Sequence, residues 1–168
     1  EPNYRYPIYN PKYNEITGEV NPSSQSIVRV SGNKGGKVVE YGDGNGGVAE
    51  TRTGGTSAWR NNNPGNIEDG SFAKNMPGYT GSDGRFAIFA TPDAGRSAQM
   101  ALLQSYIHRG IDTPMEIASR WAPGSEHGNT PAAYAQSIAH RLGIGVNDRV
   151  PVSAIPVIAD AQTIVEGG

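Results

Sequence analysis

Three threonine–proline pairs, each followed by a helical pattern, constrain the fold more than any other feature of the sequence. The pairs are Thr91-Pro92, Thr113-Pro114 and Thr130-Pro131. Threonine caps helix N-termini well, and proline suits the first helical position because the N–H that it lacks would have no partner there. Apolar residues then recur every three to four positions, until Gly110, Pro123 and Gly143 interrupt the pattern. The sequence therefore predicts three helices that begin at these prolines.

A fourth helix and a hairpin complete the expected core. Residues 154–166 form an apolar pattern, with Ser153 at the N-cap position and Pro156 in the first turn, where proline is tolerated. Residues 85–90 are predicted to form a strand that follows a turn at 82–84 and pairs with a segment near Tyr79. We therefore expect an α+β fold, mostly α, with one small antiparallel β-hairpin.

The composition changes near residue 57. Residues 1–57 hold five of the eight tyrosines, and nine glycines lie between residues 32 and 55. Valine-rich patches at 27–30 and 37–40 are candidate short strands, but so much glycine weakens any long helix or strand. We interpret residues 1–57 as an extended arm, held on a main domain of residues 58–168 by its tyrosine rings. A mostly disordered tail is the alternative, because the glycine content is typical of disorder.

Composition and missing motifs exclude several kinds of function. The 14 Lys and Arg against 16 Asp and Glu give a net charge of −2, which argues against a nucleic-acid-binding protein. The chain has no cysteine, its three histidines fit no compact metal motif, and no apolar run could span a membrane. Nucleophile-elbow, zinc-protease and P-loop motifs are missing as well. We expect a monomer with no cofactor and no metal, in which carboxylates carry any catalysis.

Two glutamates are candidates for the catalytic acid of a glycosidase, which must keep its proton at neutral pH. Glu166 ends an apolar helix, where the helix dipole and its neighbours Ile164 and Val165 should both raise the pKa of the carboxyl group. The alternative is a frayed and solvated residue. Glu126 lies in a loop between two helices, where it could instead bond backbone amides near the start of the next helix.

The asparagine cluster at residues 61–66 is the other distinctive feature. Asparagine amides both donate and accept hydrogen bonds, and this matches sugar hydroxyls and N-acetyl groups. We therefore interpret Asn62, Asn63 and Asn66 as substrate-binding residues, and Tyr79 and Tyr134 as rings that stack on sugar faces. The alternative is that the asparagines simply build a tight turn.

Five segments in order resemble a known family. Residues 59–67, WRNNNPGNI, are similar to the "RNNNPGNI" signature of phage and prophage virion proteins. The further segments are 84–89 (GRFAIF), 120–123 (RWAP), 126–130 (EHGNT, similar to "ENDT") and 164–168 (IVEGG, similar to a "HENG" helix end). The resemblance covers residues 58–168. Together with the tyrosine-rich arm, the chain resembles the virion-associated lytic enzyme of enveloped double-stranded RNA bacteriophages, the cystoviruses.

The resemblance implies a lysozyme-like or lytic-transglycosylase-like fold and a bacteriolytic enzyme. Such an enzyme is carried in the virion and degrades peptidoglycan of the host cell wall when the phage enters the cell and at lysis. Its partners would be peptidoglycan and other virion proteins. In lytic transglycosylases one glutamate at a helix end is the only acid and base, and an asparagine-rich hairpin binds the sugar, which implies those roles for Glu166 and residues 62–66. The alternatives are an endopeptidase that cuts the peptide cross-links on the same fold, and a non-catalytic wall-binding virion protein.

Overall fold

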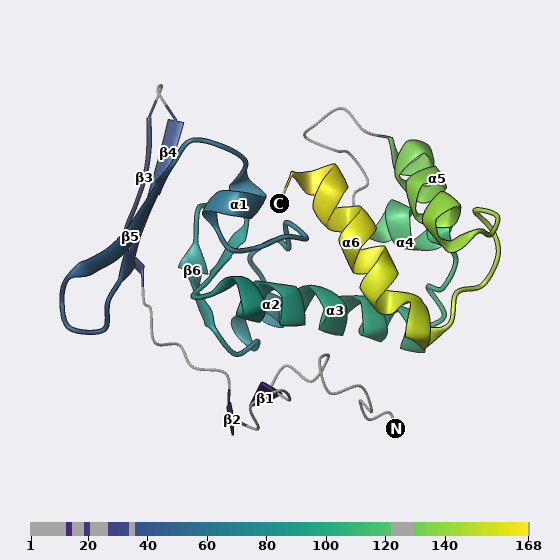
Figure 1. Cartoon of the computed structure of the whole chain (residues 1–168), viewed down its shortest axis with the longest axis horizontal. Helices are drawn as coiled ribbons and strands as arrows, with labels where there is room; N and C mark the ends of the chain where they lie inside the picture. Colours follow the sequence, from purple (N-terminus) through teal and green to yellow (C-terminus); the bar gives the residue numbers. More distant parts are fainter. Residues whose placement is uncertain (1–12, 15–18, 21–26, 34–35, 122–129, 168) are drawn as a thin grey trace.

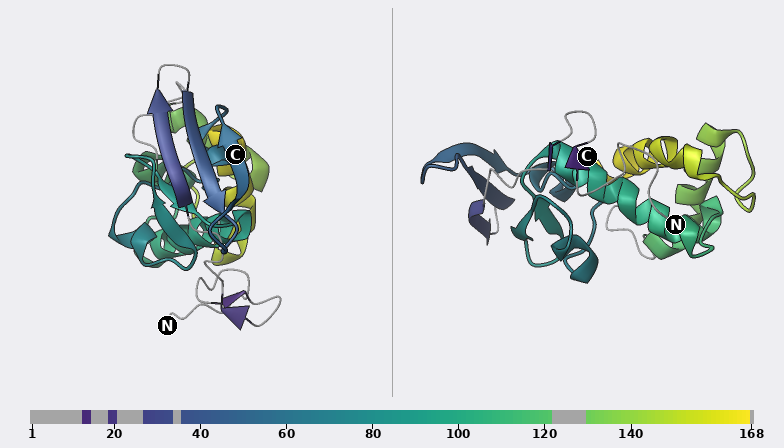
Figure 2. Two further views of the ribbon diagram at one scale, coloured as in Figure 1. Left: turned by 90° about the vertical axis from the view of Figure 1, so that its left-hand side faces the viewer. Right: turned by 90° about the horizontal axis from the view of Figure 1, so that it is seen from below.

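The computed structural model describes residues 13–14, 19–20, 27–33, 36–121 and 130–167 of the chain (Figure 1). These residues form a mixed α+β fold, as expected. A three-stranded antiparallel sheet lies at one end of the molecule and helices α4 (Pro114–Trp121) and α5 (Pro131–Leu142) lie at the other (Figure 2). Helices α3 (Pro92–His108) and α6 (Ile155–Glu166) connect the two ends.

The three helices predicted from the threonine–proline pairs are confirmed. The Thr91 and Thr130 side chains accept hydrogen bonds from backbone N–H groups three residues later, and they cap α3 and α5. Thr113 accepts the N–H of Glu116 in the same way at the start of α4, and its hydroxyl also contacts the Glu116 carboxylate at 3.2 Å. Gly143 ends α5 in the left-handed conformation, with φ +69°. These contacts are local, which is why the sequence predicts them.

The expected cap of the fourth helix is wrong. Residues 152–154 form a short 3-10 helix, η2 (Val152–Ala154), and α6 starts directly after it at Ile155. Ala154, not Ser153, stands at the N-cap position, and no side chain caps the helix. The 3-10 turn supplies the first backbone bonds, and Pro156 in the first turn removes one N–H that would need a partner.

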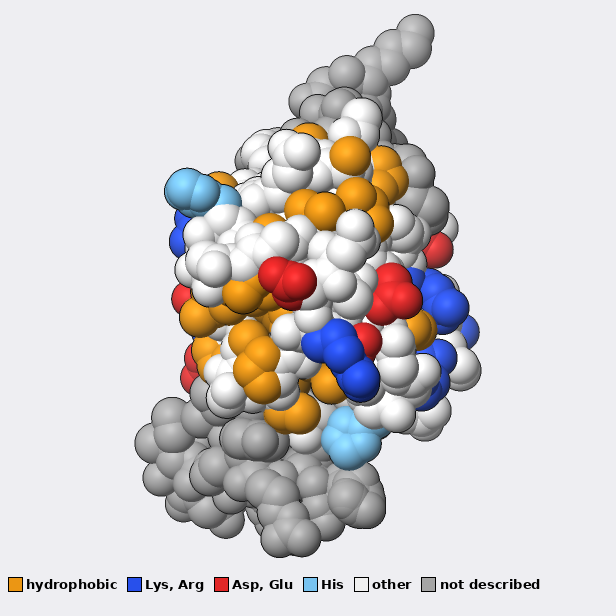
Figure 3. Space-filling model, turned by 90° about the vertical axis from the view of Figure 1, so that its right-hand side faces the viewer, with side chains coloured by type: hydrophobic (Ala, Val, Ile, Leu, Met, Phe, Trp, Pro, Cys, Tyr) orange, Lys and Arg blue, Asp and Glu red, His pale blue; other side chains and the backbone are white. Residues whose placement is uncertain are grey.

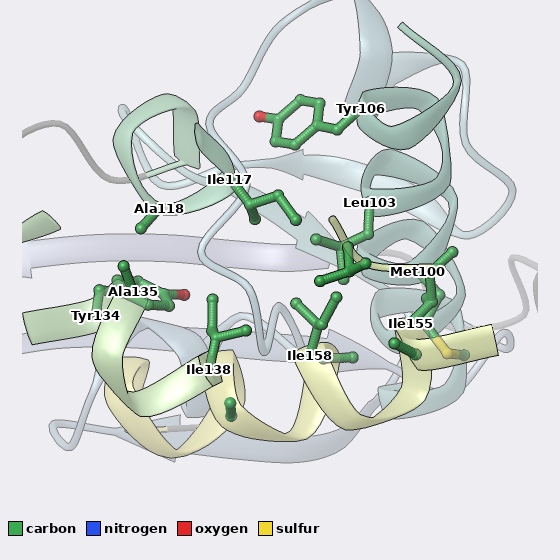
Figure 4. Close-up of a cluster of buried hydrophobic side chains, with 14 residues drawn as sticks. Met100, Leu103, Tyr106, Ile117, Ala118, Tyr134, Ala135, Ile138, Ile155 and Ile158 are labelled. Carbon is green, nitrogen blue, oxygen red and sulfur yellow. The ribbon is translucent and has the colours of Figure 1, made fainter. Parts of the chain in front are cut away.

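The main core lies between these four helices. Each helix contributes a fully buried aliphatic side chain to it: Leu103, Ile117, Ile138 and Ile158 (Figure 4). Burial of one such side chain contributes about 1.5–3 kcal/mol. The core therefore fixes how α6 packs on α3 and α5, and with it the position of the last residue of α6.

The predicted hairpin is confirmed by β6 (Tyr79–Ser82) and β7 (Ala87–Phe89), which pair antiparallel with Tyr79 opposite Phe89. Two short helices that the sequence did not predict precede it, α1 (Ser57–Arg60) and α2 (Ser71–Lys74). A second small core forms under the hairpin, where the fully buried Phe89 packs with Ala73 and Ala98. The hairpin is thus part of the folded domain, beside the N-terminal half of α3 (Figure 1).

In the described part of residues 1–57, the valine-rich patches at 27–30 and 37–40 form strands, as predicted. Strands β3 (Ile27–Asn33), β4 (Gly36–Gly42) and β5 (Val48–Thr53) make the three-stranded sheet, and β1 (Tyr13–Asn14) pairs with β2 (Glu19–Val20). The glycines are compatible with strands because several of them, including Gly44 and Gly46, lie at bends with positive φ. Tyr41 does anchor the sheet to the domain, because it is fully buried and its hydroxyl donates to the backbone carbonyl of Arg60 at 2.5 Å.

The face of the molecule on the α5 side shows acidic and basic side chains intermixed with apolar ones (Figure 3). Within the described ranges, none of the helices has both the length and the apolar character needed to cross a bilayer.

Candidate functional site

The asparagine cluster forms a tight turn between α1 and the hairpin. Asn62 and Asn66 adopt positive φ values of 52° and 49°, a conformation that asparagine tolerates better than most residues. The Asn63 amide donates to the carbonyls of Ile67 and Ala87, both at 2.9 Å, and its oxygen accepts the N–H of Ile67. The Asn62 amide donates to the carbonyl of Phe89 at 3.1 Å. Asn62 and Asn63 are therefore buried residues that clamp the turn to β7, not side chains presented to a sugar.

Helices α3 and α4 also pack against this turn. A Cβ atom added to Gly95 would lie 1.8 Å from the backbone oxygen of Asn62, so the first turns of α3 approach the asparagine turn at a distance that only glycine allows. The indole N–H of Trp121, at the end of α4, donates to the carbonyl of Gly65 at 2.7 Å. In the sequence, Trp121 stands out only as part of the segment 120–123, RWAP. Its polar N–H needs a partner when buried, and this is the signal that could have revealed the contact.

Glu166 lies at the end of α6 and reaches the asparagine turn. Its side chain is buried, with 7% of the residue exposed. The Asn66 amide donates to Glu166 Oε1 at 3.0 Å, and the Ser57 hydroxyl donates to the Asn66 oxygen at 3.1 Å. Thr56 adds a further bond from its hydroxyl to the carbonyl of Gly167 at 2.6 Å. The structure thus brings together two of the residues singled out in the sequence, Asn66 and Glu166, which are 100 positions apart.

Buried polar side chains hold α6 in this position. Gln99 of α3 is fully buried, and its amide donates to the carbonyl of Ala159 at 3.1 Å and to the side-chain oxygen of Gln162 at 3.2 Å. These bonds cross from α3 to α6 within the last two turns of α6. They fix the rotation of the helix about its own axis, and so the direction in which Glu166 points.

Tyr134 lies beneath Glu166 in the core rather than on a surface that a sugar could reach. It is 1% exposed. Burial raises the pKa of its hydroxyl above the usual range. The hydroxyl approaches the Gln162 amide without closing a hydrogen bond of good geometry. The stacking role predicted for Tyr134 therefore does not fit its position, because α5 turns this side chain inward.

Tyr79 and Glu126 are the remaining predicted site residues. The Tyr79 hydroxyl donates to an Asp69 carboxylate oxygen at 2.6 Å, and its ring packs edge-on against Phe89. Burial and the neighbouring Asp69 carboxylate raise the pKa of Tyr79 to about 12. These contacts tie Tyr79 to the hairpin rather than to Glu166. Glu126 lies in the segment 122–129, outside the described residues.

A pocket of about 320 Å³ lies beside α1. Its lining residues are Lys37, Gly55, Thr56, Ser57, Arg60, Asp83, Arg85 and Phe86. Ser57 and Thr56 belong both to this lining and to the hydrogen bonds that surround Glu166 and Gly167. The pocket has no signal in the sequence, because β4, α1 and the hairpin meet there from separate parts of the chain.

Among the described residues, no three histidine, aspartate or glutamate side chains are grouped so that they could hold a metal ion. No known protein-family model matches the chain, and no curated protein is found to be similar to it.

Proposed function

We propose that the chain is a bacteriolytic enzyme that cleaves the glycan strand of peptidoglycan, with Glu166 as the general acid. The observation that carries this proposal is the hydrogen bond from Asn66 to Glu166, which joins a buried carboxyl group at a helix end to the asparagine turn. A solvated, frayed glutamate would have argued against the chemistry. The order of segments that resembles phage lytic enzymes supports the same assignment.

The surroundings of Glu166 suit proton donation. Burial and the negative end of the α6 dipole both disfavour the charged carboxylate, so they favour a carboxyl group that retains its proton. The bond from Asn66 fixes the orientation of the group through Oε1. In the proposed reaction Glu166 gives its proton to the glycosidic oxygen as the bond to the anomeric carbon breaks. A single carboxylate suffices where groups of the sugar itself complete the reaction at that carbon.

The proposal extends to the place of action. The resemblance to virion proteins supports an enzyme that is carried in a phage particle and meets the wall of its bacterial host. It would then act on peptidoglycan when the phage enters the cell and again at lysis.

The test is digestion of purified cell walls by the Glu166→Gln variant. Glutamine has nearly the same shape and still accepts the Asn66 hydrogen bond, but it cannot donate the proton. We expect activity to fall by about 100-fold or more, the scale of a lost general acid, with little change in melting temperature. Glu116→Gln is the matched control, because Glu116 is exposed on α4 and glutamine preserves its capping contacts. Full activity of Glu166→Gln would remove Glu166 from the mechanism.

Mass spectrometry of the digested walls identifies the bond that is cut. Reducing or anhydro ends on muramic acid support the proposal. New amino groups on the peptides would overturn it in favour of an endopeptidase. Sedimentation with walls without release of soluble fragments would overturn it in favour of a wall-binding virion protein.

A further inference from the structure

The pocket that Thr56 and Ser57 help to line carries an excess of positive charge. Lys37, Arg60 and Arg85 line it, with Asp83 as the one carboxylate in the lining. Asp83 lies 3.8 Å from the Lys37 ammonium group, and Arg85 lies 3.5 Å from Glu68, which is outside the lining. An anionic ligand in this pocket would therefore meet more cationic than anionic side chains.

Asp83 is occupied by the protein itself. Its carboxylate accepts the Asn61 amide at 2.9 Å and the backbone N–H groups of Arg85 and Phe86 at 2.9 and 2.8 Å. Burial disfavours the charged carboxylate, but these hydrogen bonds and the charge of Lys37 outweigh it and hold the pKa of Asp83 below its usual range. Asp83 thus remains ionised and shapes the turn before β7, and it does not neutralise the other cations of the lining.

Arg60 is the most deeply buried cation of the lining. The residue is 93% buried, since 7% of it is exposed. Its Nη1 donates to the carbonyls of Gly54 and Gly55 at 2.7 and 3.0 Å, and this holds the guanidinium in place. Its Nε has no hydrogen-bond partner, and no carboxylate among the described residues forms an ion pair with Arg60. A buried cation without a counter-ion is costly, and a bound anion would offset that cost.

The pocket is directly connected to the proposed catalytic acid. Ser57 lines the pocket and donates to Asn66, which in turn donates to Glu166. Thr56 also lines the pocket and bonds to Gly167, the residue after Glu166. The pocket and the proposed catalytic acid are therefore joined by one set of hydrogen-bonded residues.

We infer that this pocket is an anion subsite, in which Lys37 and Arg60 bind a carboxylate or phosphate group attached to the glycan strand. The inference rests on the proposed function, and it names which part of the wall polymer the site recognises. A carboxylate would come from the lactyl group or the peptide stem of muramic acid. A phosphate would come from an anionic polymer linked to the strand.

Binding of small anionic probes to the full chain tests the subsite without any need for catalysis. The probes are N-acetylmuramic acid, its uncharged methyl ester and glycerol 3-phosphate, each titrated into the wild type, Lys37→Gln and Lys74→Gln by NMR at low salt. Lys74 is the matched control because it lies on α2, outside the pocket lining. The Lys37 side chain is 43% exposed and lies outside the hydrophobic cores, so its replacement should leave the fold intact.

We expect a charged probe to bind about tenfold more tightly than the methyl ester, with shifts at the backbone amides of Thr56, Ser57 and Arg60. Lys37→Gln should weaken that binding about three- to tenfold, and Lys74→Gln should leave it unchanged. Whichever charged probe shows this behaviour identifies the source of the anion. Equal binding of the acid and its ester, together with no charge-dependent binding of glycerol 3-phosphate, overturns the subsite. Equal effects of Lys37→Gln and Lys74→Gln overturn it too.

These outcomes are independent of the wall-digestion test. If Glu166→Gln kept full activity while the anion still bound through Lys37, the catalytic proposal would fail and the anion subsite would stand. If Glu166→Gln lost activity while the probes bound without regard to charge, the subsite alone would fail.

Discussion

Substitution of Gly95 by alanine tests whether α3 holds the asparagine turn by direct contact. The added Cβ atom would lie 1.8 Å from the Asn62 oxygen and 3.0 Å from Cδ of Pro64. The oxygen belongs to the backbone, so the contact cannot be relieved by a side-chain rotation. Either α3 or the turn must move by more than about 1 Å to restore a normal contact distance.

Two opposing effects decide the sign of the change in stability. Alanine is a better helix former than glycine and would add up to about 1 kcal/mol to the free energy of unfolding. Overpacking of a close contact costs about 1–3 kcal/mol, and a clash with the backbone belongs at the upper end of that range. We expect Gly95→Ala to be destabilising by about 1–2 kcal/mol, which lowers the melting temperature by roughly 2–8 °C for a chain of this size.

Thermal and urea denaturation measure this change, with Ser97→Ala on the same helix as the control. That variant gains helix propensity without any clash and should be as stable as the wild type or slightly more so. Wall digestion at a temperature where both variants are folded should show a larger loss for Gly95→Ala, because the displaced turn carries Asn66. If Gly95→Ala were as stable and as active as Ser97→Ala, the close approach would have no role in positioning the site.

Three further predictions follow from individual contacts. Trp121→Phe loses the hydrogen bond to the Gly65 carbonyl, so it should lower the free energy of unfolding by about 1–2 kcal/mol in urea denaturation, whereas an unchanged midpoint would contradict this contact. Thr130→Ala removes a capping bond worth about 1 kcal/mol, whereas Ser153→Ala removes none, so Thr130→Ala should have the lower melting temperature. Equal melting temperatures for the two variants would refute the capping assignment. Folding raises the pKa of Tyr79 to about 12, so the stabilising contribution of this hydroxyl is complete below pH 10 and is lost as the pH rises through 12. Tyr79→Phe should therefore reduce the loss of stability between pH 10 and 12. Titration of the Tyr79 phenolate at its ordinary pH would argue against the burial.

The local part of the fold could be read from the sequence. Thr91, Thr113 and Thr130 mark helix starts because the capping bond reaches only three residues along the chain, and Gly143 marks a helix end for the same reason. The β6–β7 hairpin was equally predictable from its turn residues. The start of α6 was not, because a 3-10 turn replaces side-chain capping there and leaves no capping residue to recognise.

The described strands between residues 27 and 53 depend on pairing with neighbouring strands. The described part contains enough glycine to suggest an extended arm, and whether its short valine-rich patches become strands is decided by pairing between them. Tyr41 anchors the resulting sheet only because Arg60 and Ile88 are already held by α1 and β7. Strand pairing depends on the partner as well as on the segment itself, so it is weakly encoded in any single segment.

The sequence by itself determined which residue types were available for chemistry and where the helices begin, since composition and capping are properties of short stretches. Only the tertiary structure decided which of these residues meet. It brought Asn66 to Glu166 across 100 positions, buried Tyr134 beneath them, committed Asn62 and Asn63 to the backbone of the hairpin, and left Arg60 in a cationic pocket. The physical reason is that these contacts depend on which helix faces pack together, and packing is settled by the whole core at once.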